Sequence, residues 1–292
     1  MVHSEAKSAS RYVAVPRLHY LEYGSRHTSA PTVVCLPGLT RNAEDFDRLA
    51  RVLAAPAGGR GRRVLALDYR GRGESGWDKD WRHYDLRFEQ LDILETLTAA
   101  DVTNAIFIGT SRGGLHIMLL AATRPSLLRG AVLNDIGPVV DITGLMRIKS
   151  YVGKLPRLKR WKEAIDFLRQ GACLHFTNVN DADWKTYARQ TFALKNGRIK
   201  LRYDPALART LDAITPESPL PELWPQFEAL KNVPVLGIRG ENSDILSPST
   251  FAEMRKRHPA FEQLVVKEQG HAPLLLDQPT ISAIAEFVAR VP

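Results

Sequence analysis

Short apolar runs recur along the chain, and each is bounded by glycine, proline or polar residues. Continuous runs of this kind, without alternation, are typical of strands buried on both faces of a parallel sheet. Stretches with apolar residues at helical spacing separate them, which predicts an α/β fold with helices covering a mainly parallel sheet. The predicted strands are residues 32–36, 63–68, 105–109, 131–134, 233–238 and 263–266, with an early antiparallel strand at 17–24, and the predicted helices are residues 42–54, 88–99, 113–123 and 280–289.

The regular spacing ends at Pro138, because about ninety residues pass before the next predicted strand, far more than an ordinary crossover needs. Residues 139–231 contain helical patterns and little that suggests a strand. We therefore expect a discontinuous core of residues 1–138 and 232–292 and a helical cap of residues 139–231. The cap tryptophans at 161, 184 and 224 are expected either to line a pocket or to pack the cap onto the core.

Composition excludes several classes of protein. Of the 292 residues, 44% are hydrophobic and 25% charged, which excludes a disordered or low-complexity chain. The net charge is +8, but the basic residues are scattered, so we expect no nucleic-acid partner. Residues 1–7 are polar, no apolar run approaches the roughly 18 residues of a membrane span, and two cysteines are too few for a disulfide framework. These features predict a cytoplasmic protein with no export signal and no membrane partner; they leave its oligomeric state open.

A candidate nucleophile lies in the segment Gly109-Thr110-Ser111-Arg112-Gly113. This segment matches G-x-S-x-G, directly after a predicted buried strand and directly before a predicted helix, which is the context that the pattern requires. A sharp strand-to-helix turn strains the backbone of its central residue, so small neighbours are needed two positions away on either side. The glycines meet that need, and Ser111 is expected to project above the sheet at the start of the helix.

A serine hydroxyl needs an imidazole base, which a carboxylate orients in turn. His271 is the best-placed histidine, because it follows the last predicted strand and precedes the final helix. Asp244 is the preferred acid, since it lies just beyond the strand run that ends at residue 238. Glu241 is a near rival, and Asp135 is an alternative acid because it also ends a strand at the carboxyl edge of the sheet.

The negative oxygen of a tetrahedral intermediate needs preorganised donors. One donor usually belongs to the residue after the nucleophile and another to an early loop. The early loop is visible here as Pro37-Gly38-Leu39-Thr40 after the first long strand run. We therefore expect an oxyanion hole made by the backbone N–H groups of Leu39 and Arg112.

These residues together resemble the α/β-hydrolase superfamily, in its serine-nucleophile, esterase-like branch with a helical cap. The turn of residues 109–113 is similar to the nucleophile elbow of that superfamily. The run from Asp68 to Ser75 (D-Y-R-G-R-G-E-S) is similar to its strand-four loop, and Gly270-His271-Ala272-Pro273 is similar to its terminal histidine segment. The resemblance implies a mostly parallel eight-stranded sheet with the cap inserted after strand six. It also implies hydrolysis through Ser111, His271 and Asp244 without a metal or an organic cofactor. Dehalogenases and epoxide hydrolases carry an aspartate at the position of Ser111, so those activities look excluded.

The sequence thus favours a serine hydrolase that cleaves carboxylic esters, with a small-molecule ester or related acyl compound as substrate. Two alternatives remain. The same triad serves carbon–carbon bond hydrolases of vinylogous diketones and enol-lactonases, for which the cap offers the basic residues Arg147, Lys149 and Arg157. The second alternative is a hydrolase-like receptor with little turnover. The Arg112 side chain is expected to form either a structural salt bridge or a bidentate contact with a substrate carboxylate.

Overall fold

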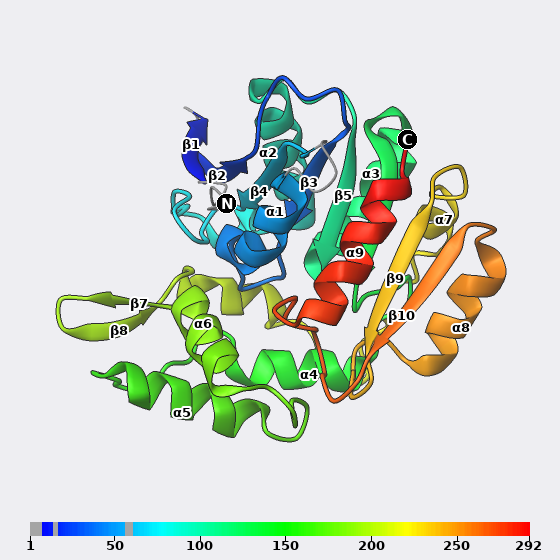
Figure 1. The fold of residues 1–292 in the computed structure, drawn as a ribbon. Coiled ribbons are helices and arrows are strands. Elements are labelled where there is room, and N and C mark those ends of the chain that lie inside the picture. Colours follow the sequence, from blue (N-terminus) through cyan, green and yellow to red (C-terminus); the bar gives the residue numbers. More distant parts are fainter. Residues whose placement is uncertain (1–7, 14–16, 56–60) are drawn as a thin grey trace.

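A mixed sheet forms the centre of the fold (Figure 1). The computed structural model describes residues 8–13, 17–55 and 61–292, so residues 1–7, on which the expectation of no export signal rests, lie outside the described residues. Within that part, eight strands pair in the order β1-β2-β4-β3-β5-β6-β9-β10, antiparallel at β1-β2-β4 and parallel elsewhere. The strands are β1 Ala9–Val13, β2 Leu18–Tyr23, β3 Thr32–Leu36, β4 Val64–Asp68, β5 Ala105–Thr110, β6 Leu128–Asn134, β9 Val235–Gly240 and β10 Phe261–Val266.

Helices cover both faces of this sheet, which explains why its central strands are mainly continuous apolar runs. In β3, Val34 and Leu36 pack on one face while Val33 and Cys35 pack on the other. The first face is covered by α2 Leu86–Ala99, α3 Arg112–Thr123, α7 Trp224–Glu228 and α8 Pro248–Arg257, and the second by α1 Asp47–Ala54 and α9 Gln278–Arg290. The predicted α/β architecture is therefore confirmed, with helices close to the predicted positions.

The chain between β6 and β9 builds the elements that lie beyond the carboxyl ends of the parallel strands (Figure 1). They include α4 Ile142–Tyr151, α5 Trp161–Ala172 and α6 Asp181–Thr191. This segment contains little strand, as expected, but the antiparallel hairpin of β7 Phe192–Lys195 and β8 Arg198–Leu201 was not predicted from the sequence. Its two-residue turn is Asn196-Gly197, both with positive φ, which is the preferred chemistry of such a turn.

This segment has two kinds of packing. Ala164, Phe192 and Ile199 form a small apolar cluster of their own, whereas Ile148 and Phe227 belong to the main core. The loop that follows α4 is held against the rest of the segment, since the N–H of Gly153 donates to the Tyr203 hydroxyl. The elements nearest the sheet are therefore continuous with its core, and α5, α6 and the hairpin form an outer layer.

Candidate active site

Ser111 lies at the sharp turn between β5 and α3, in a strained backbone conformation with φ 51° and ψ −112°. The flanking glycines permit this turn. A Cβ at Gly109 would lie 2.4 Å from the carbonyl carbon of Gly113, and a Cβ at Gly113 would lie 2.0 Å from the carbonyl oxygen of Leu36. The turn holds the hydroxyl of Ser111 at the N-terminus of a twelve-residue helix, as predicted from the glycine spacing.

His271 faces this hydroxyl from the loop after β10. Its Nε2 lies 2.8 Å from Oγ of Ser111, within hydrogen-bond distance. The imidazole is only 7% exposed, so the contact is shielded from bulk water. Ser111 and His271 are 160 residues apart in the chain, and the structure brings together these two predicted residues.

The carboxylate against His271 belongs to Asp135, directly after β6. Its Oδ2 lies 2.8 Å from Nδ1 of His271, and the aspartate is fully buried. Two donors hold it in place: the Gly240 N–H, 2.8 Å from Oδ1, and the Ser243 hydroxyl, 2.6 Å from Oδ2. A carboxylate at Nδ1 favours the tautomer with its proton on that nitrogen, which leaves Nε2 free to accept the proton of Ser111.

Asp244, the preferred acid in the sequence analysis, lies elsewhere. Its two oxygens accept hydrogen bonds of 2.5 and 2.8 Å from the Arg147 guanidinium of α4. Burial raises and Arg147 lowers the pKa of Asp244, and the net shift is downward. The prediction that Asp244 orients His271 was therefore wrong, because Gly240 at the end of β9 and Ser243 in the loop after it donate to Asp135, the residue after β6. Glu241 also has another partner, the N–H of Glu268.

Of the two predicted oxyanion donors, Arg112 directly follows Ser111 in the sequence and Leu39 belongs to the early loop. A Cβ at Gly38 would lie 3.8 Å from Cβ of Ser111, so the early loop approaches the elbow closely. Within the described part of the chain, the backbone N–H groups of Leu39 and Arg112 have no acceptor. Their assignment to an oxyanion hole stays a prediction. The Arg112 side chain is turned into the protein, where it forms a salt bridge with Glu89 rather than facing the cavity.

A cavity of about 410 Å³ opens at Ser111 and His271. Its wall is mostly apolar and comes from both the sheet loops and the segment between β6 and β9; it includes Ile148, Phe167, Leu168, Phe176, Leu201 and Leu274. The tryptophans at 161, 184 and 224 are not among the residues that line this cavity. Trp184 lies edge-on against Phe176 and Tyr187, and Trp224 against Phe227.

Three cationic side chains also line the cavity. Arg41 is neutralised by Asp45, with contacts of 2.7 and 2.6 Å, and Arg147 by Asp244. Lys154, by contrast, has no ion pair among the described residues. The other two basic residues named for a diketone substrate, Lys149 and Arg157, are not part of the cavity wall, and Lys149 donates to two backbone carbonyls.

Among the described residues, no group of three or more His, Cys, Asp or Glu side chains could hold a metal ion. None of the described helices is both long and apolar enough to cross a membrane.

Comparison with known proteins gives the site a context. The model of the alpha/beta hydrolase family matches residues 33–283. The chain is similar to the 3-hydroxybutyrate-oligomer hydrolase of Cupriavidus necator, 33% identical over 281 residues, covering 93% of this chain and 92% of that protein. It is 28% identical to a mouse sn-1-specific diacylglycerol lipase, covering 82% and 75%. A crystal structure of an alpha/beta hydrolase from Novosphingobium aromaticivorans matches with a TM-score of 0.89 and 38% identity, covering 98% of this chain and 99% of that one.

Proposed function

Because this chain belongs to the alpha/beta hydrolase family, we propose that it cleaves carboxylic esters through an acyl-enzyme formed on Ser111. The observation that carries the proposal is the relay of two 2.8 Å contacts, from Ser111 to His271 and from His271 to Asp135, at the end of an apolar cavity. Such a relay gives a serine hydroxyl both a base and an oriented tautomer of that base.

In the first half of the reaction, Nε2 of His271 removes the proton of Ser111 as Oγ attacks the ester carbonyl. The negative oxygen that develops is stabilised by the N–H groups of Leu39 and Arg112. Collapse of this intermediate breaks the ester C–O bond, and His271 gives its proton to the departing alcohol. Water then attacks the acyl-enzyme by the same route, which releases the acid and restores Ser111.

Asp135 keeps the imidazole oriented and stabilises its charged form during both halves. The Gly240 N–H and the Ser243 hydroxyl each donate to one of its oxygens and hold it in this orientation. Arg147 and Asp244 have a different role in this proposal. They tie α4 to the loop after β9 and help to hold residues 139–231 as a cap over the cavity.

The cavity favours a small ester with an apolar acyl group and an anionic end. Its volume and apolar wall suit a short acyl chain, and Lys154 offers an unpaired charge for a carboxylate. A linear oligomer of a hydroxy acid carries both features, since each unit is an ester and one end is a free carboxylate. The similarity to a 3-hydroxybutyrate-oligomer hydrolase makes such oligomers the first compounds to assay.

The test is turnover of a p-nitrophenyl ester series from acetate to dodecanoate, and of 3-hydroxybutyrate trimer, with wild type and Ser111→Ala measured together. We expect wild type to favour the shorter acyl chains and the serine variant to lose about 10³-fold or more in rate. Equal turnover in the two proteins would refute the acyl-enzyme. Folded, inactive wild type would refute the esterase proposal and redirect the search to vinylogous diketones and to ligand binding without turnover.

A further inference from the structure

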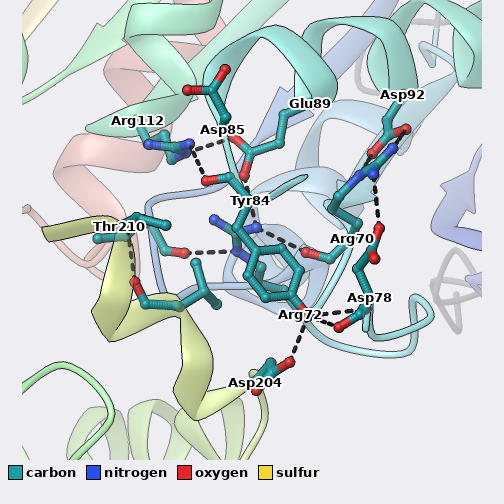
Figure 2. A network of polar contacts seen from close by, with 12 residues as sticks. Arg70, Arg72, Asp78, Tyr84, Asp85, Glu89, Asp92, Arg112, Asp204 and Thr210 are labelled. Carbon is teal, nitrogen blue, oxygen red and sulfur yellow. Dashed lines mark hydrogen bonds and ion pairs between the residues drawn. The ribbon is translucent and has the colours of Figure 1, made fainter. Parts of the chain in front are cut away.

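Glu89 of α2 lies at the centre of a buried cluster of charged side chains behind the nucleophile elbow (Figure 2). Its Oε1 lies 2.7 Å from Nη1 of Arg72, and its Oε2 accepts a 2.6 Å hydrogen bond from Nε of Arg112. Nε2 of His116 is 3.0 Å from the same Oε2. Glu89, Arg72 and His116 are fully buried, so one carboxylate joins three partners away from water.

Arg72 connects this carboxylate to the early loop. Its Nε donates a 2.9 Å hydrogen bond to the carbonyl of Leu39, and its Nη1 donates to the carbonyl of Arg70 at 2.8 Å. The guanidinium lies over the rings of Tyr69 and Tyr84, 5.6 Å from each centroid, so it has little room to move. The fixed carbonyl restrains the backbone of Leu39, and with it the direction of the Leu39 N–H.

Arg112 connects the same carboxylate to the residue after the nucleophile. In addition to its bond to Glu89, its Nη2 donates a 3.2 Å hydrogen bond to the carbonyl of Tyr84 (Figure 2). The side chain therefore spans from the first turn of α3 to the loop before α2. This contact restrains the backbone of Arg112 at the position where its N–H faces no acceptor within the described chain.

The charge of the cluster is positive. The Gln90 amide donates to both the carbonyl and Nδ1 of His116, so the proton of this imidazole is on Nε2 and is donated to Glu89. Burial lowers the pKa of His116, which keeps it neutral. One carboxylate then faces two guanidinium groups. Buried charges are costly, and replacing a buried ion pair by apolar residues of similar volume is often neutral or stabilising, so stability alone is a weak reason for this cluster.

We propose that Glu89 and Arg72 are positioning residues for the oxyanion hole. Through the Glu89 carboxylate they fix the two donors, the N–H groups of Leu39 and Arg112, in position relative to each other. This inference rests on the proposed function. It goes beyond it, because it assigns a role in turnover to residues that do not reach the cavity.

The test compares Arg72→Met with Arg70→Met, two arginines of one loop. Arg70 is also held by a carboxylate, with two contacts of 2.6 Å to Asp92, but its side chain does not contact Leu39. We expect Arg72→Met to lower kcat for p-nitrophenyl butyrate by about 10- to 100-fold with KM within about threefold, since the loss of a whole donor costs about 10²-fold or more. Arg70→Met should keep wild-type kcat even if its Tm falls.

A second readout does not depend on the substrate. A fluorophosphonate reacts with Ser111 through a negatively charged oxygen, so its labelling rate should fall in Arg72→Met in parallel with kcat and stay unchanged in Arg70→Met. If Arg72→Met does not fold, Arg112→Met, which keeps the N–H but loses the contact to Glu89, should show the same losses.

The outcomes separate the two proposals. Equal labelling rates in the Arg72 and Arg70 variants, or equal rates in Arg112→Met and wild type, would overturn the positioning role. Wild type that is labelled at Ser111 but hydrolyses no ester would overturn the proposed substrate class and leave the positioning role to be decided by the labelling rates.

Discussion

The Ser243 hydroxyl donates a 2.6 Å hydrogen bond to Oδ2 of Asp135, the oxygen that also faces Nδ1 of His271. This contact joins the loop after β9 to the end of β6. With the Gly240 N–H on the other oxygen, it holds a fully buried carboxylate in one orientation. Hydrogen bonds to ionised groups are stronger than neutral ones, so the loop after β9 contributes to the site as a support for the acid.

Removal of the Ser243 hydroxyl should weaken turnover without abolishing it. A hydrogen bond to a charged group contributes about 1.5 to 3 kcal/mol, and Asp135 retains two other donors. We expect Ser243→Ala to lower kcat by about 5- to 20-fold. Ser249→Ala is the matched control, because Ser249 is exposed and its hydroxyl contacts Ser247 rather than the site. A variant as active as this control would show that the orientation of Asp135 does not depend on Ser243.

Asp135→Asn and Asp244→Asn should differ in kind. An asparagine at 135 can offer its amide to Nδ1 and favour the wrong tautomer of His271, so kcat should fall by about 10³- to 10⁴-fold. Asp244→Asn breaks a half-buried ion pair with Arg147 and should cost about 1 kcal/mol of stability, with kcat within about threefold. Ester kinetics and thermal melts on both proteins check this. A folded Asp244→Asn protein without activity would instead identify Asp244, in the loop after β9, as the acid.

The elbow should tolerate no side chain at Gly113. A Cβ there would lie 2.0 Å from the Leu36 carbonyl oxygen, so Gly113→Ala should cost about 3 kcal/mol or more and reduce activity in any protein that still folds. Gly171→Ala is the contrasting change, because this glycine of α5 has open space around its Cβ position. It should raise stability by up to about 1 kcal/mol. Urea unfolding measures both, and equal effects of the two changes would contradict the packing argument.

Lys154 should matter only for substrates that carry a free carboxylate. Lys154→Met removes the lining cation that has no ion pair within the described chain, so KM for 3-hydroxybutyrate trimer should rise by about 5- to 10-fold, corresponding to about 1 kcal/mol for an exposed ion pair. The methyl ester of the same trimer should show no change in KM. Equal effects on the acid and its methyl ester would contradict a charge contact.

Stability should fall as the pH falls, and His116 should contribute. Burial lowers the pKa of this imidazole from its ordinary 6.5, so the unfolded chain binds more protons than the folded chain below about pH 6.5. One such group changes stability by at most about 1.4 kcal/mol per pH unit. His116→Gln keeps a donor for Glu89 without a titrating ring. The decrease in Tm between pH 7 and pH 5 should be smaller in this variant, and an equal decrease would exclude His116 as a source.

Local sequence signals predicted part of the site. Gly109 and Gly113 identify Ser111 because the turn excludes a Cβ at both positions, and His271 follows from its place after the last strand. The acid did not follow, because Asp135 and Asp244 both lie just beyond strands at the same edge of the sheet, and only the loop conformations decide which carboxylate meets the imidazole.

The β7–β8 hairpin and the burial of Glu89 were not predicted from the sequence, for different reasons. Asn196-Gly197 was a readable hairpin signal that was missed. Glu89 carried no such signal, because a glutamate in a helix usually faces water, and its burial depends on arginines 17 residues before it and 23 residues after it.

The position of Asp135 also bears on which part of the chain can vary. Asp135 and Ser111 come from the neighbouring strands β6 and β5, and the Ser111 N–H donates directly to the carbonyl of Asn134. Both residues precede residues 139–231 in the chain. Under the proposed function, substrate choice can therefore change with residues 139–231, while Ser111 and Asp135 keep a register set by two adjacent strands.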